Sequence, residues 1–182
     1  MESKPKRIIG LVGGICSGKS TVSAILKDCG CFCLDCDKLG HRVYEPNTDG
    51  FRRIVETFGK EVVGEDGTIN RRVLGSIVFS DPEKMKQLTA ISWPLIHDMA
   101  REEIEKCHES IIVVEAAVLL EAKWNDLVDE IWVVEVDHDT AVKRLQSRNH
   151  FTTEECEKRI RNQWSNEQRE AFADVIIHNN GS

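Results

Sequence analysis

Short apolar runs alternate along this chain with longer amphipathic stretches. The apolar runs lie at about 7–12, 31–35, 111–117, 130–136 and 175–177, and all of them except 31–35 contain valine and isoleucine. Such runs, bounded by polar or turn residues, predict buried β-strands. The amphipathic stretches predict helices at about 19–28, 138–148 and 152–170, and Gly30 is placed to end the first of them.

Strands that alternate with helices predict a parallel sheet with helices on both faces. We therefore expect an α/β fold with a five-stranded parallel sheet flanked by helices. The segment between the second and third strands, 40–108, has a mostly helical pattern and is the candidate for a second module. The chain has no internal repeat or low-complexity segment.

The turn after the first expected strand carries the most specific pattern in the chain. It reads Gly13-Gly14-Ile15-Cys16-Ser17-Gly18-Lys19-Ser20 and fits the phosphate-binding pattern G-x-x-x-x-G-K-[ST] at every fixed position. Glycines let successive N–H groups turn toward phosphate oxygens, and the following helix adds positive partial charge at its N-terminus. We expect these residues and Thr21 to bind ATP, with an exposed Lys19 at the β- and γ-phosphates and Ser20 at Mg²⁺. An ordinary glycine-rich turn is the alternative.

Composition narrows the classes of function. The chain has 182 residues and a formal net charge of −7, which argues against a nucleic-acid-binding surface. No apolar run is long enough to span a membrane, and the N-terminal residues lack the apolar region of a signal peptide. Seven cysteines in an acidic chain are typical of reduced thiols, so we expect a cytoplasmic protein, with mitochondrial association left open.

Four of the cysteines lie close together, at Cys29, Cys31, Cys33 and Cys36. Their spacing is not a common zinc pattern, and the second expected strand contains two of them. We therefore expect small buried hydrophobic residues here, with a metal site as the alternative. Cys16 lies in the phosphate loop, and we favour a small residue filling a small space over a redox-sensitive thiol.

Acidic residues lie at the ends of the expected strands, where parallel sheets bind ligands. Asp35 and Asp37 follow the second strand and Glu115 lies in the third. A kinase needs a carboxylate to accept the proton of the acceptor hydroxyl and acids to hold Mg²⁺ with its waters. Asp35 is expected to face the γ-phosphate, whereas Asp37 could also cap a helix that begins at Lys38. A buried Glu115 needs a partner, so we expect it near Mg²⁺ or Lys19.

Arginines gather late in the chain. The lids of small-molecule kinases use arginines to stabilise the transferred phosphoryl group. For any single arginine, a solvated surface position beside glutamates is the simpler interpretation, but from the group we expect at least one phosphate contact. The residues are Arg144, Arg148, Arg159, Arg161 and Arg169.

In this order, the motifs resemble those of dephospho-coenzyme A kinases, and the resemblance covers nearly the whole chain. It is carried by the phosphate loop, Asp35-x-Asp37, Asp66-Gly67-x-Ile69-Asn70-Arg71-x-x-Leu74-Gly75, Arg144-Leu145-x-x-Arg148, Arg159-Ile160-x-x-Gln163 and Ala173-Asp174-x-Ile176-Ile177-x-Asn179-x-Gly181. The most similar members are the kinase halves of animal bifunctional coenzyme A synthases, which share Gly40-His41-Arg42, Trp93-Pro94 and the segment 116–122.

The resemblance implies one P-loop kinase domain over 1–182, with a helical acceptor-substrate insertion at 40–108 and a lid at 144–170. The implied activity is ATP-dependent phosphorylation of the ribose 3′-hydroxyl of dephospho-coenzyme A. Fusion to, or action with, the preceding adenylyltransferase of the pathway is a further implication. The implied site residues are Lys19, Asp35 and Arg148 for catalysis, Asn179 with the loop for ATP, Asp37 and Arg71 for the acceptor, and Ser20 with Glu115, through water, for Mg²⁺.

Three departures from the family pattern keep alternatives open. Trp93 replaces the histidine usual before proline in bacterial members, and Glu115 replaces an aspartate. The chain ends at Ser182, where relatives usually continue into a closing helix, so a non-catalytic nucleotide-binding relative is one alternative. A GTPase switch is another, because Asp37-Lys38-Leu39-Gly40 matches D-x-x-G, although the N-K-x-D guanine motif is missing.

Overall fold

The computed structural model describes residues 6–181, which divide into two compact units. One unit holds the described chain up to Asp35 and from Lys106 onward, and the other comprises Cys36–Glu105. Each unit has its own buried apolar residues and is described by itself. Among the described helices, none is long and apolar enough to cross a membrane.

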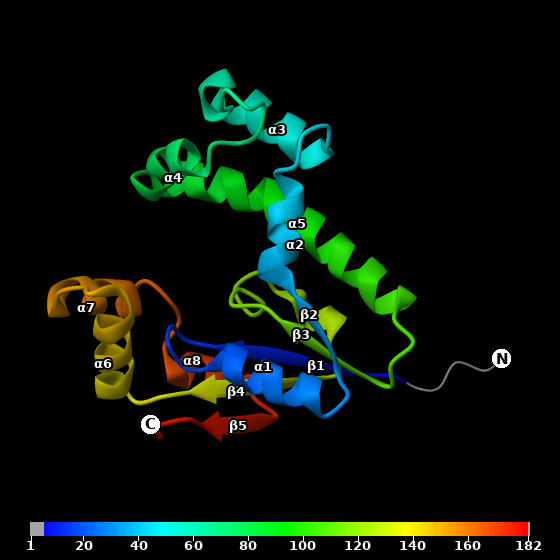
Figure 1. Ribbon diagram of the computed structural model, residues 1–182, viewed down its shortest axis with the longest axis vertical. Coiled ribbons are helices and arrows are strands. Elements are labelled where there is room, and N and C mark those ends of the chain that lie inside the picture. The colour runs from blue at the N-terminus through cyan, green and yellow to red at the C-terminus, as the bar shows by residue number, and fades with distance from the viewer. Residues whose placement is uncertain (1–5, 182) are drawn as a thin grey trace. The chain divides into compact units, whose positions relative to one another are not determined.

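The first unit is built on a five-stranded, all-parallel sheet in the order β2-β3-β1-β4-β5 (Figure 1), as predicted. Its third strand ends two residues earlier than expected, because the chain turns over 117–123, where the Ala122 N–H donates to the Val118 carbonyl. Leu119 lies in this turn and is fully buried in the sheet unit. The strands are β1 Arg7–Gly13, β2 Phe32–Asp35, β3 Ile111–Glu115, β4 Glu130–Glu135 and β5 Val175–His178.

The core between the sheet and the first helix explains most of the cysteine cluster. Leu11, Val113 and Val134 are fully buried, and Cys31 and Cys33 pack against them together with apolar side chains of α1 (Lys19–Asp28). The expectation of packing is thus confirmed for these two cysteines and for the buried Cys36. It is wrong for Cys29, which is exposed because it caps α1 directly before a left-handed Gly30, the predicted helix end.

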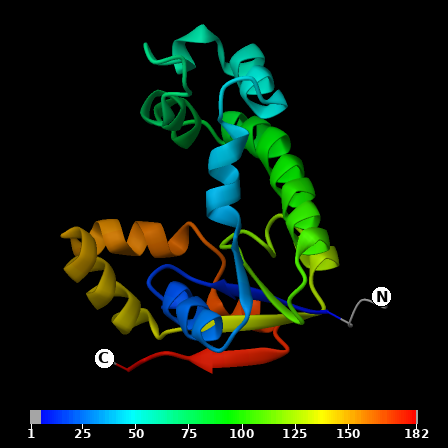
Figure 2. The ribbon, with the colours of Figure 1, turned by 45° about the vertical axis from the view of Figure 1, so that its right-hand side comes forward.

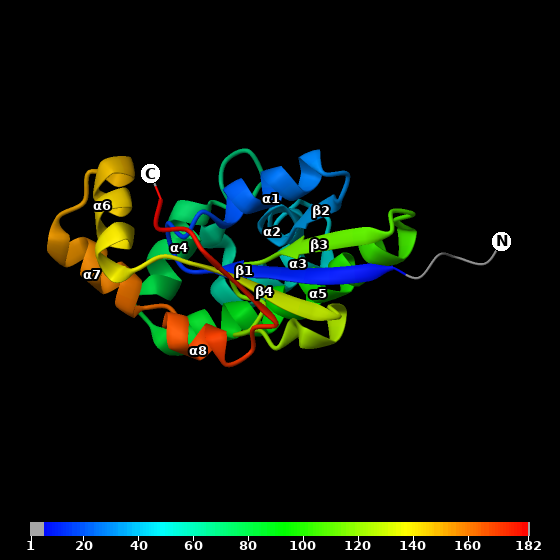
Figure 3. The ribbon, with the colours of Figure 1, turned by 90° about the horizontal axis from the view of Figure 1, so that it is seen from below.

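Helices cover both faces of the sheet. Figure 3 shows α1 on one face and α8 (Asn166–Glu170) on the other, while α6 (His138–Asn149) and α7 (Thr153–Arg161) lie beyond the carboxyl ends of the strands. The single helix expected over 152–170 is wrong, because the chain breaks between α7 and α8. Ser165 and Gln168 form a reciprocal capping box that begins a new helix. The break leaves 162–165 as a linker.

The second unit is helical (Figure 2) and consists of short helices and one long one. Thr48 caps the second of these helices and Asn70 the third, each with its side-chain oxygen. The first helix begins at Cys36, so Asp37 lies inside its first turn. The alternative that Asp37 caps a helix beginning at Lys38 is therefore wrong. The elements are α2 Cys36–Val43, α3 Asp49–Phe58, η1 Lys60–Val62, α4 Arg71–Phe79 and α5 Pro82–Lys106.

Candidate active site

Two glycines of the loop between β1 and α1 have no room for a side chain. A Cβ atom on Gly13 would lie 2.5 Å from Ser17 Oγ and 2.6 Å from the Val134 carbonyl oxygen. Gly18 has a left-handed φ of 87°, and a Cβ atom there would lie 2.1 Å from Asn179 Nδ2. Close packing around the loop therefore requires glycine at both positions.

The loop is held from outside by side chains that are distant in the sequence. Arg144 donates to the Cys16 carbonyl at 3.2 Å, and Asn179 donates to the Ser17 carbonyl at 2.9 Å. Arg144 also donates to the Asn179 carbonyl at 2.8 Å, which joins the two supports. Because the C=O and N–H of a trans peptide point in opposite directions, the Gly18 N–H turns away from Asn179 and toward the inside of the loop.

The lysine and serine that end the loop meet one carboxylate at the end of β3. Glu115 Oε1 lies 2.9 Å from Lys19 Nζ and 3.1 Å from Ser20 Oγ. The side chains of Lys19 and Glu115 are 13% and 12% exposed, so the expected exposure of Lys19 is wrong. Burial alone would raise the pKa of Glu115, but hydrogen bonds and charge from Lys19, with Ser20 and Ser23, hold it below its usual value. Glu115 is therefore an anion in this site.

Asp35 lies beside Glu115 at the carboxyl ends of neighbouring strands. The two residues are Cα partners in the parallel β2–β3 pairing, and Glu115 is level with Leu11 of β1. Strands in a sheet are about 4.8 Å apart, and paired residues on parallel strands point to the same face. Two carboxylates and the Ser20 hydroxyl thus share one edge of the sheet, on the side of α1.

This oxygen-rich edge fits Mg²⁺. The ion prefers oxygen ligands, keeps several waters, and needs few protein ligands when phosphates complete its shell. Among the described residues there is no cluster of three histidine, cysteine or acidic side chains that could hold a metal alone. The Ser20 hydroxyl and the acidic pair agree with a nucleotide-linked Mg²⁺ rather than a closed metal centre.

The residues expected at the acceptor belong to the helical unit. Arg71 begins α4 and is exposed, and its guanidinium lies 5.3 Å from the centre of the Tyr44 ring. Burial raises the pKa of Tyr44, and the charge of Arg71 partly opposes this. Asp37 is exposed in the first turn of α2. A cavity of about 580 Å³ in this unit, lined by 47–49 and residues of α3, includes neither Asp37 nor Arg71.

The late arginines have different environments. Arg148 is exposed in the last turn of α6, whereas Arg159 lies over the Phe151 ring at 4.2 Å. Arg161 is exposed and donates to the Glu157 carbonyl. The solvated-surface interpretation is wrong for Arg169, which is buried at 3% exposure.

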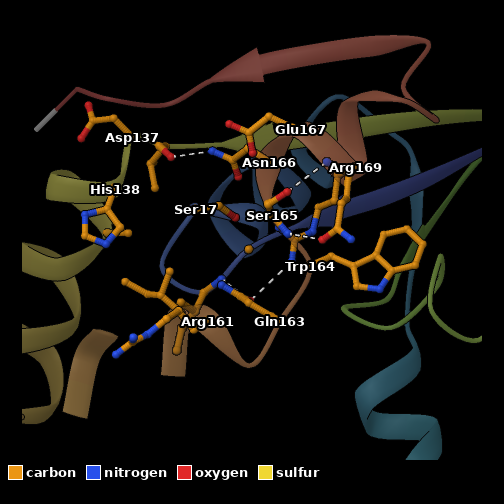
Figure 4. Close-up of a pocket in the computed structure, with 16 residues that line it drawn as sticks. Ser17, Asp137, His138, Arg161, Gln163, Trp164, Ser165, Asn166, Glu167 and Arg169 are labelled. Atoms are coloured by element: carbon orange, nitrogen blue, oxygen red, sulfur yellow. Dashed lines mark hydrogen bonds between the residues drawn. The ribbon is translucent and has the colours of Figure 1, made fainter. Parts of the chain in front are cut away.

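A cavity of about 580 Å³ lies against the outside of the phosphate loop. Gly14, Ile15 and Ser17 contribute to its wall, and Figure 4 shows Asp137 and His138 on one side with Trp164 and Arg169 on the other. Gln163, in the same wall, accepts a hydrogen bond from the Ile15 N–H at 3.0 Å. In the sequence Gln163 stands out only as part of the Arg159-Ile160-x-x-Gln163 motif, and nothing local in the sequence places it at the loop.

Comparisons with known proteins agree on one family. The sequence profile described as dephospho-CoA kinase matches residues 7–182. A dephospho-CoA kinase of Carboxydothermus hydrogenoformans is 43% identical over 96% of this chain and 86% of its own length. That of Geobacter sulfurreducens is 43% identical over 96% of this chain and 90% of its own length.

Solved structures give the same result. A Thermus thermophilus protein superposes with a TM-score of 0.83 at 32% identity, covering 98% of this chain and 91% of its own. The dephospho-CoA kinase from Campylobacter jejuni superposes with a TM-score of 0.71 at 25% identity, covering 97% and 90%. A shikimate kinase from Acinetobacter baumannii, with a TM-score of 0.55 at 14% identity over 97% of this chain and 86% of its own, shares the fold.

These matches bear on the remaining expectations. They favour a dephospho-CoA kinase over a GTPase switch or a non-catalytic relative. The relatives reported above are bacterial, and the closer resemblance to animal coenzyme A synthases stays a prediction. The comparisons give no support to fusion with an adenylyltransferase or to mitochondrial association.

Proposed function

Because the chain belongs to the dephospho-CoA kinase family, we propose that it transfers the γ-phosphoryl group of ATP to the ribose 3′-hydroxyl of dephospho-CoA, giving ADP and coenzyme A. The observation that carries the proposal is the meeting of Lys19 and Ser20 with a carboxylate at the carboxyl edge of the sheet, directly beyond a phosphate loop. P-loop kinases use ATP at this place, and positioning with electrostatic stabilisation provides most of their catalysis.

Asp35 is our proposed base. It ends β2 beside Glu115 and is partly exposed, so a substrate hydroxyl can approach it. In the reaction the 3′-oxygen forms a bond to the γ-phosphorus, the bond from that phosphorus to the β,γ-bridging oxygen breaks, and the hydroxyl proton passes to the carboxylate. Glu115 is less suited to this role, because Lys19 and Ser20 already occupy one of its oxygens.

Lys19 is proposed to stabilise charge on the β- and γ-phosphates. Its ammonium group is held by Glu115 at 2.9 Å, and an ammonium group has further donors for phosphate oxygens. Mg²⁺, when bound, neutralises phosphate charge, and Ser20 directly and Glu115 through water would hold it. Asn179 is proposed for ATP binding because it already fixes the Ser17 peptide of the loop.

The lid, 144–170, is proposed to supply Arg148 to the transferred phosphoryl group. Of the arginines in this segment, Arg144 is bound to backbone carbonyls, and Arg169 is buried. Arg148 is exposed in the last turn of α6, and Figure 1 shows that helix beyond the carboxyl ends of the strands, the edge of a parallel sheet where ligands bind. A guanidinium there could contact the phosphoryl group in the transition state.

The helical unit is proposed to bind the acceptor through Asp37 and Arg71. Replacing Arg71 with alanine is expected to raise the Michaelis constant for dephospho-CoA at least ~10-fold, because one charge-assisted phosphate contact is worth about 1.5–3 kcal/mol. The constant for ATP is expected to stay nearly unchanged. Saturation curves for both substrates measure this, and the neighbouring exposed Arg72→Ala is the matched control. An equal rise in the ATP constant would mean that this unit is not dedicated to the acceptor.

The proposed function is tested by measuring ADP release in a coupled assay with three acceptors. Dephospho-CoA is expected to support rapid turnover, whereas pantetheine phosphate and shikimate are expected to give only background ATP hydrolysis. Preference for either of the other acceptors would reject the proposed substrate. ADP release that needs no acceptor would indicate an ATPase.

A further inference from the structure

We propose that Gln163 is a positioning residue for phosphoryl transfer. It fixes the first half of the phosphate loop, and Arg169 in turn holds Gln163 in place. The inference rests on the proposed function, since it concerns the same loop. Gln163 lies in the 162–165 linker that joins α7 of the proposed lid to α8 on the sheet. It is partly buried, and its carbonyl oxygen Oε1 accepts from the Ile15 N–H at 3.0 Å.

The pair is packed directly on the loop. A Cβ atom on Gly14 would lie 3.3 Å from Gln163 Nε2 and 3.2 Å from Arg169 Nη1, so both side chains lie against the Gly14 backbone. Arg169 Nη2 donates to Gln163 Oε1 at 3.4 Å, a long hydrogen bond. The Gln163 oxygen therefore accepts from a loop amide on one side and from a guanidinium on the other.

Arg169 is a buried cation packed against the loop. It is only 3% exposed, and burial lowers the pKa of its guanidinium, while the charge of Glu121 opposes that effect. A guanidinium keeps its charge even when buried and can only donate hydrogen bonds, so its contact with Oε1 fixes the orientation of the Gln163 amide, with the oxygen rather than the NH₂ group facing the Ile15 N–H. Gln163 and Arg169 thus form one unit anchored on α8.

The same loop is held at three successive residues by side chains from three separate segments. Gln163 binds the Ile15 N–H, Arg144 binds the Cys16 carbonyl, and Asn179 binds the Ser17 carbonyl. A loop that must present several amides to one phosphate group depends on such fixing, because misplacement by about 1 Å can cost on the order of 100-fold in rate. Arg144 and Asn179 fix the later residues of the loop, and Gln163 fixes the residues nearest β1.

The test compares Gln163→Leu with Gln168→Leu in the full chain. Leucine at 163 leaves the Ile15 amide without its acceptor, and we expect kcat/KM for ATP and the affinity for ADP to fall about 10- to 100-fold. The Michaelis constant for dephospho-CoA should change little, whereas the melting temperature should fall, because the Ile15 amide and the buried Arg169 both lose a hydrogen-bond acceptor. Gln168 belongs to the capping box of α8, so its loss should lower the melting temperature and leave the kinetics intact.

A second variant keeps the proposal falsifiable if leucine harms folding. Gln163→Glu retains an acceptor for Ile15 and gives Arg169 an ionic partner, so its ADP affinity should lie closer to wild type than that of the leucine variant. ADP binding is measured by calorimetry and needs no acceptor, which separates this inference from the proposed substrate. Unchanged ADP affinity in Gln163→Leu, or equal losses in Gln163→Leu and Gln168→Leu, would overturn the inference.

Discussion

Replacing Lys19 with alanine is expected to lower the turnover number by more than ~100-fold, the loss typical of removing one preorganised donor from a developing anion. Lys19 is the lysine of the phosphate-loop pattern and begins α1, and its ammonium group lies 2.9 Å from Glu115. Initial rates at saturating ATP and dephospho-CoA measure the effect. Near-normal turnover by the variant would reject the assignment of this loop to phosphate binding.

The same substitution is also expected to destabilise the fold, because Lys19 and Glu115 are both largely covered. Removing one partner of a covered ion pair leaves the other charge without compensation. The double variant Lys19→Met/Glu115→Gln removes both charges, so it should recover much of the melting temperature lost in Lys19→Ala without recovering turnover. Recovery of both would show that the rate loss came from unfolding.

Replacing Asp35 with asparagine is expected to lower turnover by about 10²–10⁴-fold, the range typical of a general base or orienting carboxylate. The substitution keeps the size of the side chain and removes its charge. We expect ATP affinity to change little. Calorimetric titration with ADP and steady-state kinetics with both substrates separate the two quantities.

Asp37→Asn is the matched control, because it makes the same change two residues away. Asp37 lies in the first turn of α2, where a negative charge stabilises a helix by about 0.3–1 kcal/mol. We expect a higher Michaelis constant for dephospho-CoA and nearly normal turnover. A loss of turnover equal to that of Asp35→Asn would show that the roles within this acidic pair are wrongly assigned.

The sheet and the loop could be predicted because their signals are local. Each strand is a short apolar run, and the glycines and Lys19 of the loop have fixed spacing in the sequence. The Lys19–Glu115 contact could also be predicted, because a buried glutamate at the end of a strand needs a cation as its partner. The break between α7 and α8 had a local signal as well, the Ser165–Gln168 capping box, which the helical pattern on either side concealed.

The supports of the loop could not be predicted, because they depend on tertiary structure. Arg144 and Gln163 are far along the chain from Cys16 and Ile15. They belong to the connection between β4 and β5, and the fold of that connection brings them to the loop. A charged surface helix and a helix that supports a loop have the same pattern in sequence. For the same reason, the burial of Arg169 could not be read from its acidic neighbours.

The position of the transferred phosphate tests the central claim most directly. The protein would be incubated with ATP, Mg²⁺ and dephospho-CoA, and the product identified by mass spectrometry and phosphorus NMR. We predict one new phosphomonoester, on the 3′-oxygen of the ribose, formed in equal amount to ADP. A phosphate on any other atom of the acceptor, or ADP formed while dephospho-CoA stays unchanged, would contradict the assignment of this chain as a dephospho-CoA kinase.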